Sequence, residues 1–269
     1  MEINKIYNED CLETMARMSD NYIDLTVTSP PYDNLRNYNG YSFDFENIAK
    51  ELYRVTKIGG IVVWIVGDAT INKSETGTSF KQALYFVECG FNLHDTMIYE
   101  KNGCPFPSKK NGNRYSQIFE FMFVFSKDTK PKTTNLICDK PNKWAGFKNW
   151  GKSLYRNKEG DLIERKQKPT PDFSPRNNIW KYNTGKGYST KDDLAFKHPA
   201  IFPEKLARDH ILSWSNEVDL VYDCFSGSGT TLKMAHINNR NWIGSEISKE
   251  YIDLSYKRLK PYLTQTSLF

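Results

Sequence analysis

The chain has few residues that form disulfides or bind metal ions, and it has no long apolar run. Its five cysteines are odd in number and include no CxxC pair, and its four histidines show no metal-ligand spacing. A disulfide framework or a structural metal site is therefore not expected. The sequence shows no N-terminal signal peptide and no apolar run of membrane length, so we expect a cytoplasmic protein without a membrane anchor.

The positive charge of the chain is concentrated in one segment. The 269 residues carry a formal net charge of +5, and residues 126–197 alone contain 17 Lys and Arg against 8 Asp and Glu. The rest of the chain has a slight acidic excess. This distribution favours a polyanionic partner, and a solvated lysine-rich surface is the alternative.

Strand and helix patterns alternate in two blocks, residues 1–126 and 198–269. Short apolar runs at 22–28, 61–66, 218–225 and 241–248 predict buried strands. Amphipathic stretches at 45–57, 204–215 and 249–263 predict helices, the first of them ended by Gly59 and Gly60. The alternation indicates an α/β fold with a mostly parallel, twisted sheet. Residues 127–197, rich in Lys, Asn, Pro and Gly with interleaved aromatics, predict an inserted irregular lobe.

A glycine segment, "DCFSGSGTT" at 223–231, joins a predicted strand to a predicted helix. Gly227 and Gly229 let the backbone turn tightly at the sheet edge where open α/β folds bind ligands. The segment lacks the lysine of a P-loop and the third glycine of a dinucleotide fingerprint. Glu246 ends the next predicted strand, where a carboxylate can accept both hydroxyls of a ribose. Together these features favour a nucleoside cofactor, S-adenosylmethionine, and a ligand-free turn is the alternative.

The segment "TSPPY" at 28–32 follows a predicted buried strand. Its prolines, Pro30 and Pro31, fix φ and remove backbone donors, so the loop is pre-shaped. The hydroxyl of Ser29 and the carbonyl of Pro30 can accept hydrogen bonds from a planar amine, while Tyr32 stacks on its ring, a contact worth roughly 1–3 kcal/mol. The segment therefore predicts a receptor for an exocyclic amine on a flat heterocycle; a proline-rich binding motif and a plain strand-end turn are the alternatives.

These motifs, in this order, resemble those of the amino-specific DNA methyltransferases of the β arrangement. "TSPPY" comes first, the basic lobe second and "DCFSGSGTT" third, while "NEDCLETM", "HPAIFPEKLARDHI" and "NWIGSEIS" resemble three further family motifs. The resemblance covers essentially the whole chain, although Cys224 stands where proline is commonest. It implies a Rossmann-like S-adenosylmethionine-dependent methyltransferase fold with permuted motif order, and an inserted DNA-recognition lobe. Residues 1–126 would form its catalytic half, 127–197 the recognition insertion and 198–269 the cofactor-binding half.

The resemblance also assigns site residues. The catalytic residues it implies are Ser29, Pro30, Pro31 and Tyr32. No metal is implied. The cofactor-binding residues it implies are Asp10, Cys11, Phe202, Pro203, Asp223, Phe225, Gly227, Gly229, Thr230 and Glu246.

Serine before the prolines, preceded by Thr28, resembles the cytosine-N4 group of this family, whereas its adenine enzymes mostly carry Asp or Asn there. We therefore expect site-specific methylation of the N4 amine of a cytosine flipped out of duplex DNA, as in the modification enzyme of a restriction-modification system. Adenine-N6 methylation is the first alternative. Methylation of RNA or of a protein amide nitrogen, and a non-catalytic DNA-binding module, are the others. Methylation of cytosine at carbon 5 needs a cysteine nucleophile, which the related family carries directly after a proline. Cys104 precedes a proline, so this activity is disfavoured.

Duplex DNA is the expected partner, contacted by residues 127–191 and by a loop at 33–41. Lysines would bind phosphates, and Arg36, Arg156, Arg165 and Arg176 are candidates for contacts to DNA. A restriction endonuclease would be a partner only in function. The recognition sequence and the oligomeric state stay open at this point.

Overall fold

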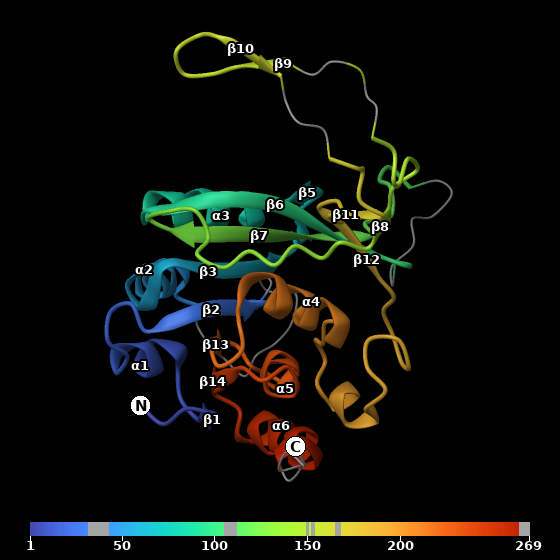
Figure 1. Ribbon diagram of the computed structural model, residues 1–269. Coiled ribbons are helices and arrows are strands. Elements are labelled where there is room, and N and C mark those ends of the chain that lie inside the picture. Colours follow the sequence, from blue (N-terminus) through green and yellow to red (C-terminus); the bar gives the residue numbers. More distant parts are fainter. Residues whose placement is uncertain (32–42, 105–111, 149–150, 152–153, 165–167, 264–269) are drawn as a thin grey trace. The chain divides into compact units, whose positions relative to one another are not determined.

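The computed structural model describes residues 1–31, 43–104, 112–148, 151, 154–164 and 168–263 (Figure 1). These residues form two compact units. The first comprises residues 1–135 and 178–269, and the second comprises residues 136–177.

The first unit is built on one sheet. Among the described residues it has eight strands in the order β1-β14-β13-β2-β3-β7-β6-β12. Every neighbouring pair is parallel except the two that involve β7, so the predicted mostly parallel α/β sheet is confirmed. The strands are β1 (Lys5–Tyr7), β2 (Ile23–Thr28), β3 (Thr56–Val66), β6 (Phe91–Lys101), β7 (Phe119–Lys127), β12 (Ile179–Tyr182), β13 (Leu220–Asp223) and β14 (Asn241–Ser245).

Helices cover both faces of this sheet. On one side lie α1 (Cys11–Ala16), α2 (Phe45–Val55) and α3 (Thr78–Glu88), and on the other α4 (Glu204–Trp214), α5 (Thr230–Ile237) and α6 (Lys249–Leu263). Alternation along β3 explains the two layers, because successive side chains of a strand point to opposite faces. Trp64 packs in one core cluster with Leu52 of α2 and Phe86 of α3, while on the opposite face Met122 of β7 contacts His210 of α4.

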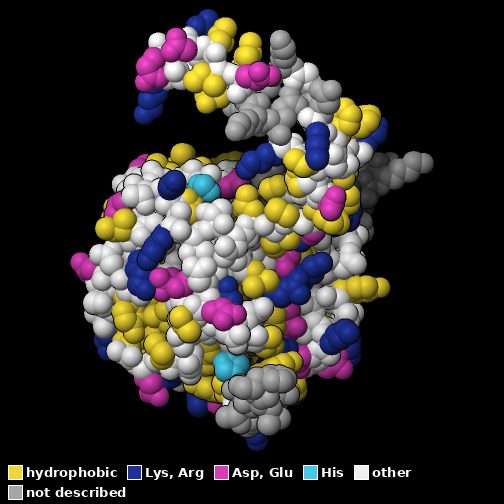
Figure 2. All heavy atoms as spheres, viewed as in Figure 1, with side chains coloured by type: hydrophobic (Ala, Val, Ile, Leu, Met, Phe, Trp, Pro, Cys, Tyr) yellow, Lys and Arg dark blue, Asp and Glu magenta, His cyan; other side chains and the backbone are white. Residues whose placement is uncertain are grey.

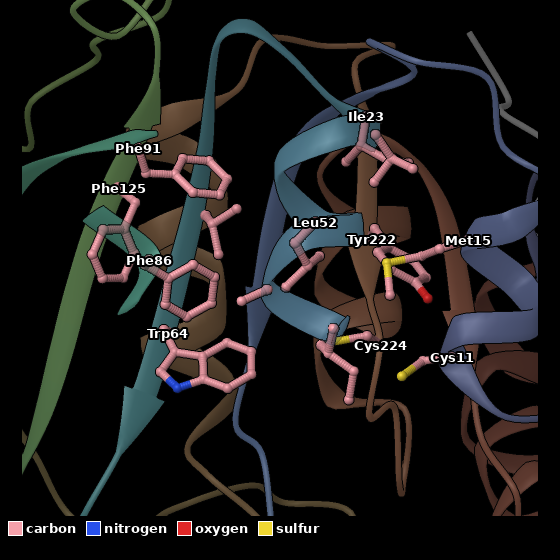
Figure 3. Packing of buried hydrophobic residues seen from close by; sticks show 14 of the residues in the cluster. Cys11, Met15, Ile23, Leu52, Trp64, Phe86, Phe91, Phe125, Tyr222 and Cys224 are labelled. Carbon is pink, nitrogen blue, oxygen red and sulfur yellow. The ribbon is translucent and has the colours of Figure 1, made fainter. Parts of the chain in front are cut away.

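The core on the α1–α3 side is rich in aromatic rings (Figure 3). Phe86 stacks on Phe125 with ring centroids 4.7 Å apart, and Trp64 meets Phe86 edge-on at 5.1 Å. The indole N–H of Trp64, fully buried, donates to Oε1 of Gln82 at 2.8 Å, so its one polar atom is satisfied. Figure 3 also shows Cys224, directly after β13, and Cys11 of α1 in this cluster, which ties the carboxyl end of β13 to the N-terminal segment.

One predicted boundary was wrong. Gly59 and Gly60 do not end the helix at 45–57, because α2 ends at Val55 and β3 already begins at Thr56. Gly59 has φ +73°, and its carbonyl accepts a hydrogen bond from Lys132 N at 2.9 Å. The two glycines thus lie inside an irregular first part of β3, where its register with β2 shifts.

The chain between the two predicted blocks contributes one strand to the main sheet. Ile179–Tyr182 forms β12, which pairs in parallel with β6 at the sheet edge. Trp180 and Tyr182 are buried there. Tyr182 OH donates to Oδ2 of Asp209 in α4 at 2.8 Å, which holds this edge strand against the helix layer.

The second unit has little regular structure. Within its described part, two short antiparallel ladders occur, β8 (Lys140–Pro141) with β11 (Phe173–Ser174) and β9 (Leu154–Arg156) with β10 (Leu162–Glu164). All described side chains of β9 and β10 are exposed. The unit is shorter than the irregular lobe expected at residues 127–197. In the first unit, β4 (Thr70–Ile71) pairs with β5 (Ser74–Glu75), and η1 (Asp193–Lys197) is a 3-10 helix.

Figure 2 shows basic, acidic and apolar side chains interspersed over the face of the first unit that it displays. No helix in the described part of the chain is both long and apolar enough to cross a bilayer.

Candidate active site

The carboxyl ends of β2 and β13 meet at the point where the sheet changes its winding direction. The connection after β2 runs through α2 on one face, and the connection after β13 runs through α5 on the other. Open α/β sheets bind ligands at this kind of switch point. "TSPP" begins at the last residue of β2 and the glycine segment at the last residue of β13, so two motifs far apart in sequence lie at the carboxyl end of the sheet.

Direct hydrogen bonds join the two strand ends. Oγ1 of Thr28 donates to Oδ1 of Asp223 at 2.7 Å, and Oγ1 of Thr231 donates to the carbonyl of Val27 at 3.2 Å. All four residues are buried. Ser29, which follows Thr28 directly, is half-buried. Its backbone position is therefore fixed by a neighbour that is bonded to the other motif.

Asp223 is a buried carboxylate with an altered acidity. Burial raises its pKa to about 6, because a low-polarity environment disfavours the charged form. Hydrogen bonds from the Thr28 hydroxyl and from Phe225 N, the latter at 3.1 Å, act in the opposite direction. Asp223 is thus held in place by donors from both motifs.

The glycine segment turns through two left-handed residues, Gly227 at φ +48° and Gly229 at φ +75°. A Cβ atom on Gly227 would lie 2.9 Å from Nε2 of His198, and one on Gly229 would lie 2.8 Å from Oγ of Ser255. Glycine is therefore required at both positions by backbone conformation and by packing. Thr230 begins α5 immediately afterwards.

Glu246 follows β14 and faces the same segment. Its Oε2 accepts a hydrogen bond from Gly227 N at 2.9 Å, and its Oε1 accepts one from Ser248 N at 2.8 Å. Burial raises the pKa of this carboxyl above its usual value. A carboxylate offers about four lone-pair sites, so this one retains capacity for further donors. This acceptor fits the two hydroxyls of a ribose.

The N-terminal segment reaches the same region. Nδ2 of Asn8 donates to the carbonyl of Glu246 at 3.1 Å, and Glu246 N donates to Tyr7 O at 3.0 Å. Oδ1 of Asp10 caps α1 by accepting from Leu12 N at 2.7 Å. Cys11, the first residue of α1, is buried in the core cluster. The structure thus brings the Asp10 segment to the end of β14.

The other predicted residues differ in their surroundings. Pro203 is buried as the N-terminal cap of α4, and Phe202 before it is half-buried. The ring of Phe225 packs edge-on against Trp64, with centroids 6.3 Å apart. Pro30 is buried and Pro31 is half-buried. Tyr32, Arg36 and the predicted loop at 33–41 lie outside the described residues, as does Arg165.

Two residues near these motifs carried no predicted role. The sequence motifs give Thr28 no role beyond its place before Ser29, and they give His198 none beyond its place in a motif. The signal for Thr28 was its place at the end of a buried apolar strand, where a hydroxyl needs a partner. Within the described residues, no group of three or more His, Cys, Asp or Glu has the arrangement of a metal site, and no two of the five cysteines form a disulfide.

The fold of this chain is shared with solved methyltransferases. The PvuII DNA methyltransferase, described as cytosine-N4-specific, superposes with a TM-score of 0.69 at 21% identity, covering 100% of this chain and 89% of that one. A DNA modification methylase of Thermus thermophilus, solved in complex with S-adenosyl-L-methionine, gives a TM-score of 0.68 at 20% identity, covering 98% and 96%. The fold is that of an S-adenosylmethionine-dependent methyltransferase.

Sequence relatives narrow this class. The orphan methyltransferase M.BamHII of Bacillus amyloliquefaciens is 62% identical over 247 residues, which are 91% of this chain and 92% of the relative. The type II methyltransferase M.BglII of Bacillus subtilis is 28% identical, and the match covers 96% of this chain and 69% of that relative. A family model described as DNA methylase matches residues 23–257. The chain therefore belongs to this family of DNA methyltransferases, whose methyl donor is S-adenosylmethionine.

Proposed function

We propose that this DNA methyltransferase transfers the methyl group to the N4 amine of a cytosine flipped out of duplex DNA. The supporting observation is the hydrogen bond from Thr28 to Asp223, because it joins the strand that ends in "TSPP" to the strand that enters the glycine segment. The order of the two motifs along the chain supports the β arrangement. A role as the cytoplasmic modification enzyme beside a restriction endonuclease is part of the same proposal.

The choice of base rests on Ser29. Serine before the two prolines favours cytosine N4 over adenine N6, where the family mostly has Asp or Asn. A neutral hydroxyl is a weaker base than a carboxylate, so Ser29 would orient the amine more than deprotonate it. Adenine N6 is the alternative base in the same site.

The cofactor pocket we propose is formed at the carboxyl edge of the sheet. Bound S-adenosylmethionine supplies an electrophilic methyl group on its sulfonium. Glu246 would accept hydrogen bonds from the ribose hydroxyls with its remaining lone pairs. The glycine turn would form the floor of the pocket next to it. The remaining wall residues would be Asp10 and Cys11 near the adenine, Phe202 and Pro203 near the methionine part, and Asp223, Phe225, Gly227, Gly229 and Thr230 along the glycine segment.

The target amine would be activated by geometry. Its lone pair is delocalised into the ring, and hydrogen bonds to Oγ of Ser29 and to the carbonyl of Pro30 favour a tetrahedral nitrogen. That nitrogen would accept the methyl group that bound S-adenosylmethionine supplies. Ser29 would relay the amine proton toward water. Stacking on Tyr32 holds the flipped base during these steps.

Residues 127–191, with the loop at 33–41, would supply most DNA contacts. In the second unit, Arg176 is paired with Asp139, and Nη1 of Arg156 donates to the carbonyl of Gly160 at 2.8 Å. Both guanidiniums therefore have protein partners, and exposed lysines such as Lys143 and Lys148 are better placed to bind phosphates.

Methyl transfer in direct competition tests the proposal. Labelled S-adenosylmethionine is offered with equal amounts of duplex DNA, RNA and an unrelated protein mixture, and label is expected in the duplex only. Neutralising Lys143 and Lys148 together should weaken DNA binding and lower its salt slope by about 2, since each phosphate contact contributes about 0.9. The matched control is Lys249→Gln on α6, with no change expected. Label in RNA or protein in preference to DNA would overturn the substrate assignment.

A further inference from the structure

Arg258 of α6 is a charged residue in the core, directly behind the glycine turn. Its side chain is 0% exposed. Nη1 donates to the carbonyl of Ser228, to Oγ of Ser228 at 3.0 Å and to Oγ1 of Thr230 at 3.3 Å. One side of the guanidinium is therefore bonded entirely to the glycine segment.

The other side of the same guanidinium binds two carboxylates. Nε donates to Oδ2 of Asp192 at 2.8 Å, and Nη2 donates to Oε1 of Glu204 at 2.9 Å. Lys233 of α5, with a side chain that is 5% exposed, donates to the same Oε1 at 2.8 Å. The cluster thus contains two cations and two carboxylates, so its formal charge is balanced.

The two carboxylates belong to the segment that borders the proposed cofactor pocket. Glu204 is the first residue of α4, directly after Phe202 and Pro203. Asp192 caps η1 through Leu194 N at 3.0 Å, and η1 leads to His198, whose ring packs against Gly227. A single side chain therefore joins the glycine turn to the start of α4.

Ser228 lies between two glycines with left-handed φ, where the backbone has the most freedom. A fixed donor to its carbonyl and hydroxyl selects one conformation of the turn. Stability alone does not account for the cluster, since apolar side chains often replace buried ion pairs without loss. The planar fork of arginine, with its fixed donor directions, is what a positioning role requires.

We propose that Arg258, held by Asp192 and Glu204, is a positioning residue that sets the glycine turn for cofactor binding. The proposal rests on the proposed function, in which that turn forms the floor of the S-adenosylmethionine pocket. Loss of the fork should weaken cofactor binding while methyl transfer at saturation is nearly unchanged, because Arg258 lies behind the turn and away from the "TSPP" motif.

The test compares Arg258→Met with a control of the same chemistry. Arg240, also buried, donates to the carbonyl and hydroxyl of Ser215 at 2.6 and 3.1 Å, next to the amino end of β14. We expect Arg258→Met to raise the calorimetric Kd for S-adenosylmethionine at least about tenfold, with kcat at saturating cofactor and DNA within about threefold of wild type. Arg240→Met should lose thermal stability and keep the wild-type Kd.

A charge-balanced double variant separates positioning from stability. Asp192→Asn with Arg258→Met leaves Lys233 and Glu204 as a matched pair, and asparagine still caps η1. We expect its thermal stability to recover while its Kd stays raised. The inference would be overturned if the double variant recovered both its thermal stability and the wild-type Kd. It would also be overturned if the Kd of Arg258→Met were unchanged, or if the Kd of Arg240→Met rose by as much.

Two further readouts keep the test decisive. If Arg258→Met does not fold, Arg258→Lys preserves the charge without the fork, and its Kd must still rise for the inference to hold. Wild-type protein that binds no S-adenosylmethionine would sink the proposed function itself. Wild-type binding with unchanged variants would sink only the role of Arg258.

Discussion

Thr28 Oγ1 and Asp223 Oδ1 are hydrogen-bonded at 2.7 Å, although the residues are 195 positions apart in the chain. The bond crosses from the end of β2 to the end of β13 in the buried centre of the sheet. It makes the position of Ser29 depend on the strand that enters the glycine turn. The two motifs are therefore joined by a direct hydrogen bond at the carboxyl end of the sheet.

Replacing Thr28 by the isosteric valine should lower both the stability of the protein and its rate of methyl transfer. The change removes one of the hydrogen bonds to Oδ1 of Asp223 and leaves the one from Phe225 N. A hydrogen bond to a charged group contributes about 1.5–3 kcal/mol. We expect the free energy of unfolding in urea to fall by that amount and kcat to fall more than the affinity for S-adenosylmethionine. Thr26→Val is the matched control, because Thr26 lies on the same strand and its hydroxyl has no hydrogen-bond partner within the described residues. Equal effects of the two changes would contradict the role of the bond.

The pH dependence of stability should carry a signature of Asp223. Its folded-state pKa of about 6 is above the ordinary 3.8, so the folded protein binds the proton more tightly than the unfolded chain. Stability from this group is fully present below pH 3.8 and is lost as the pH rises through about 6, by about 3 kcal/mol in total.

The variant that isolates this effect is Asp223→Asn. Unfolding free energies at about pH 4 and pH 7 should show that wild type loses about 2.4 kcal/mol more than the variant over this range. Buried His210, whose pKa burial lowers to about 3, acts with the opposite sign but is present in both proteins and cancels. Parallel curves for the two proteins would mean that Asp223 does not titrate here.

Removing the carboxylate of Glu246 should mainly weaken the binding of S-adenosylmethionine. Glu246→Ala deletes the proposed acceptor of two ribose hydroxyls, so the Kd for S-adenosylmethionine should rise at least tenfold, or about 1.4 kcal/mol. Isothermal calorimetry measures this directly. Glu217→Ala removes an exposed carboxylate near the opposite end of β13 and should leave the Kd unchanged. A wild-type Kd in Glu246→Ala would remove this residue from the pocket.

The ring of Tyr32 should affect methyl transfer to the base and leave the affinity for the cofactor unchanged. Tyr32→Ala removes the proposed stacking surface, worth roughly 1–3 kcal/mol, so methyl transfer should slow by about fivefold to 150-fold. Tyr32→Phe keeps the ring and should retain most activity. Steady-state kinetics with duplex DNA and calorimetry with the cofactor separate the two effects. Equal activity in the alanine and phenylalanine variants would argue against stacking.

The sequence predicted the central strands and the order of the motifs well. β3 has a continuous apolar run at 61–66, and β2, β13 and β14 are buried along most of their length, because helices cover both faces of the sheet. Gly59 and Gly60 misled the prediction, since glycine pairs end helices in many chains but here lie in the irregular start of β3. β12 was missed because "IWKY" is short, lies among Lys, Asn and Gly, and becomes a strand only by pairing with β6.

The motif residues were predicted, but the bonds that connect them were not. The bond from Thr28 to Asp223 joins distant segments, and local patterns carry no information on such pairs. Arg258 looks like one more surface charge in a helix rich in Lys. Its signal is positional: it falls on the same helix face as Leu254 and Ser255, both buried, and a cation on that face needs partners.

Nucleoside analysis of the methylated product tests the central claim most directly. Duplex DNA is methylated with the purified wild-type protein and labelled S-adenosylmethionine, digested to nucleosides and separated by liquid chromatography with mass spectrometry. We predict N4-methylcytosine as the methylated nucleoside, and far less of it from Tyr32→Ala at matched time. N6-methyladenine in its place would contradict the base assignment drawn from Ser29, and a digest without any methylated nucleoside would contradict the proposed activity on DNA.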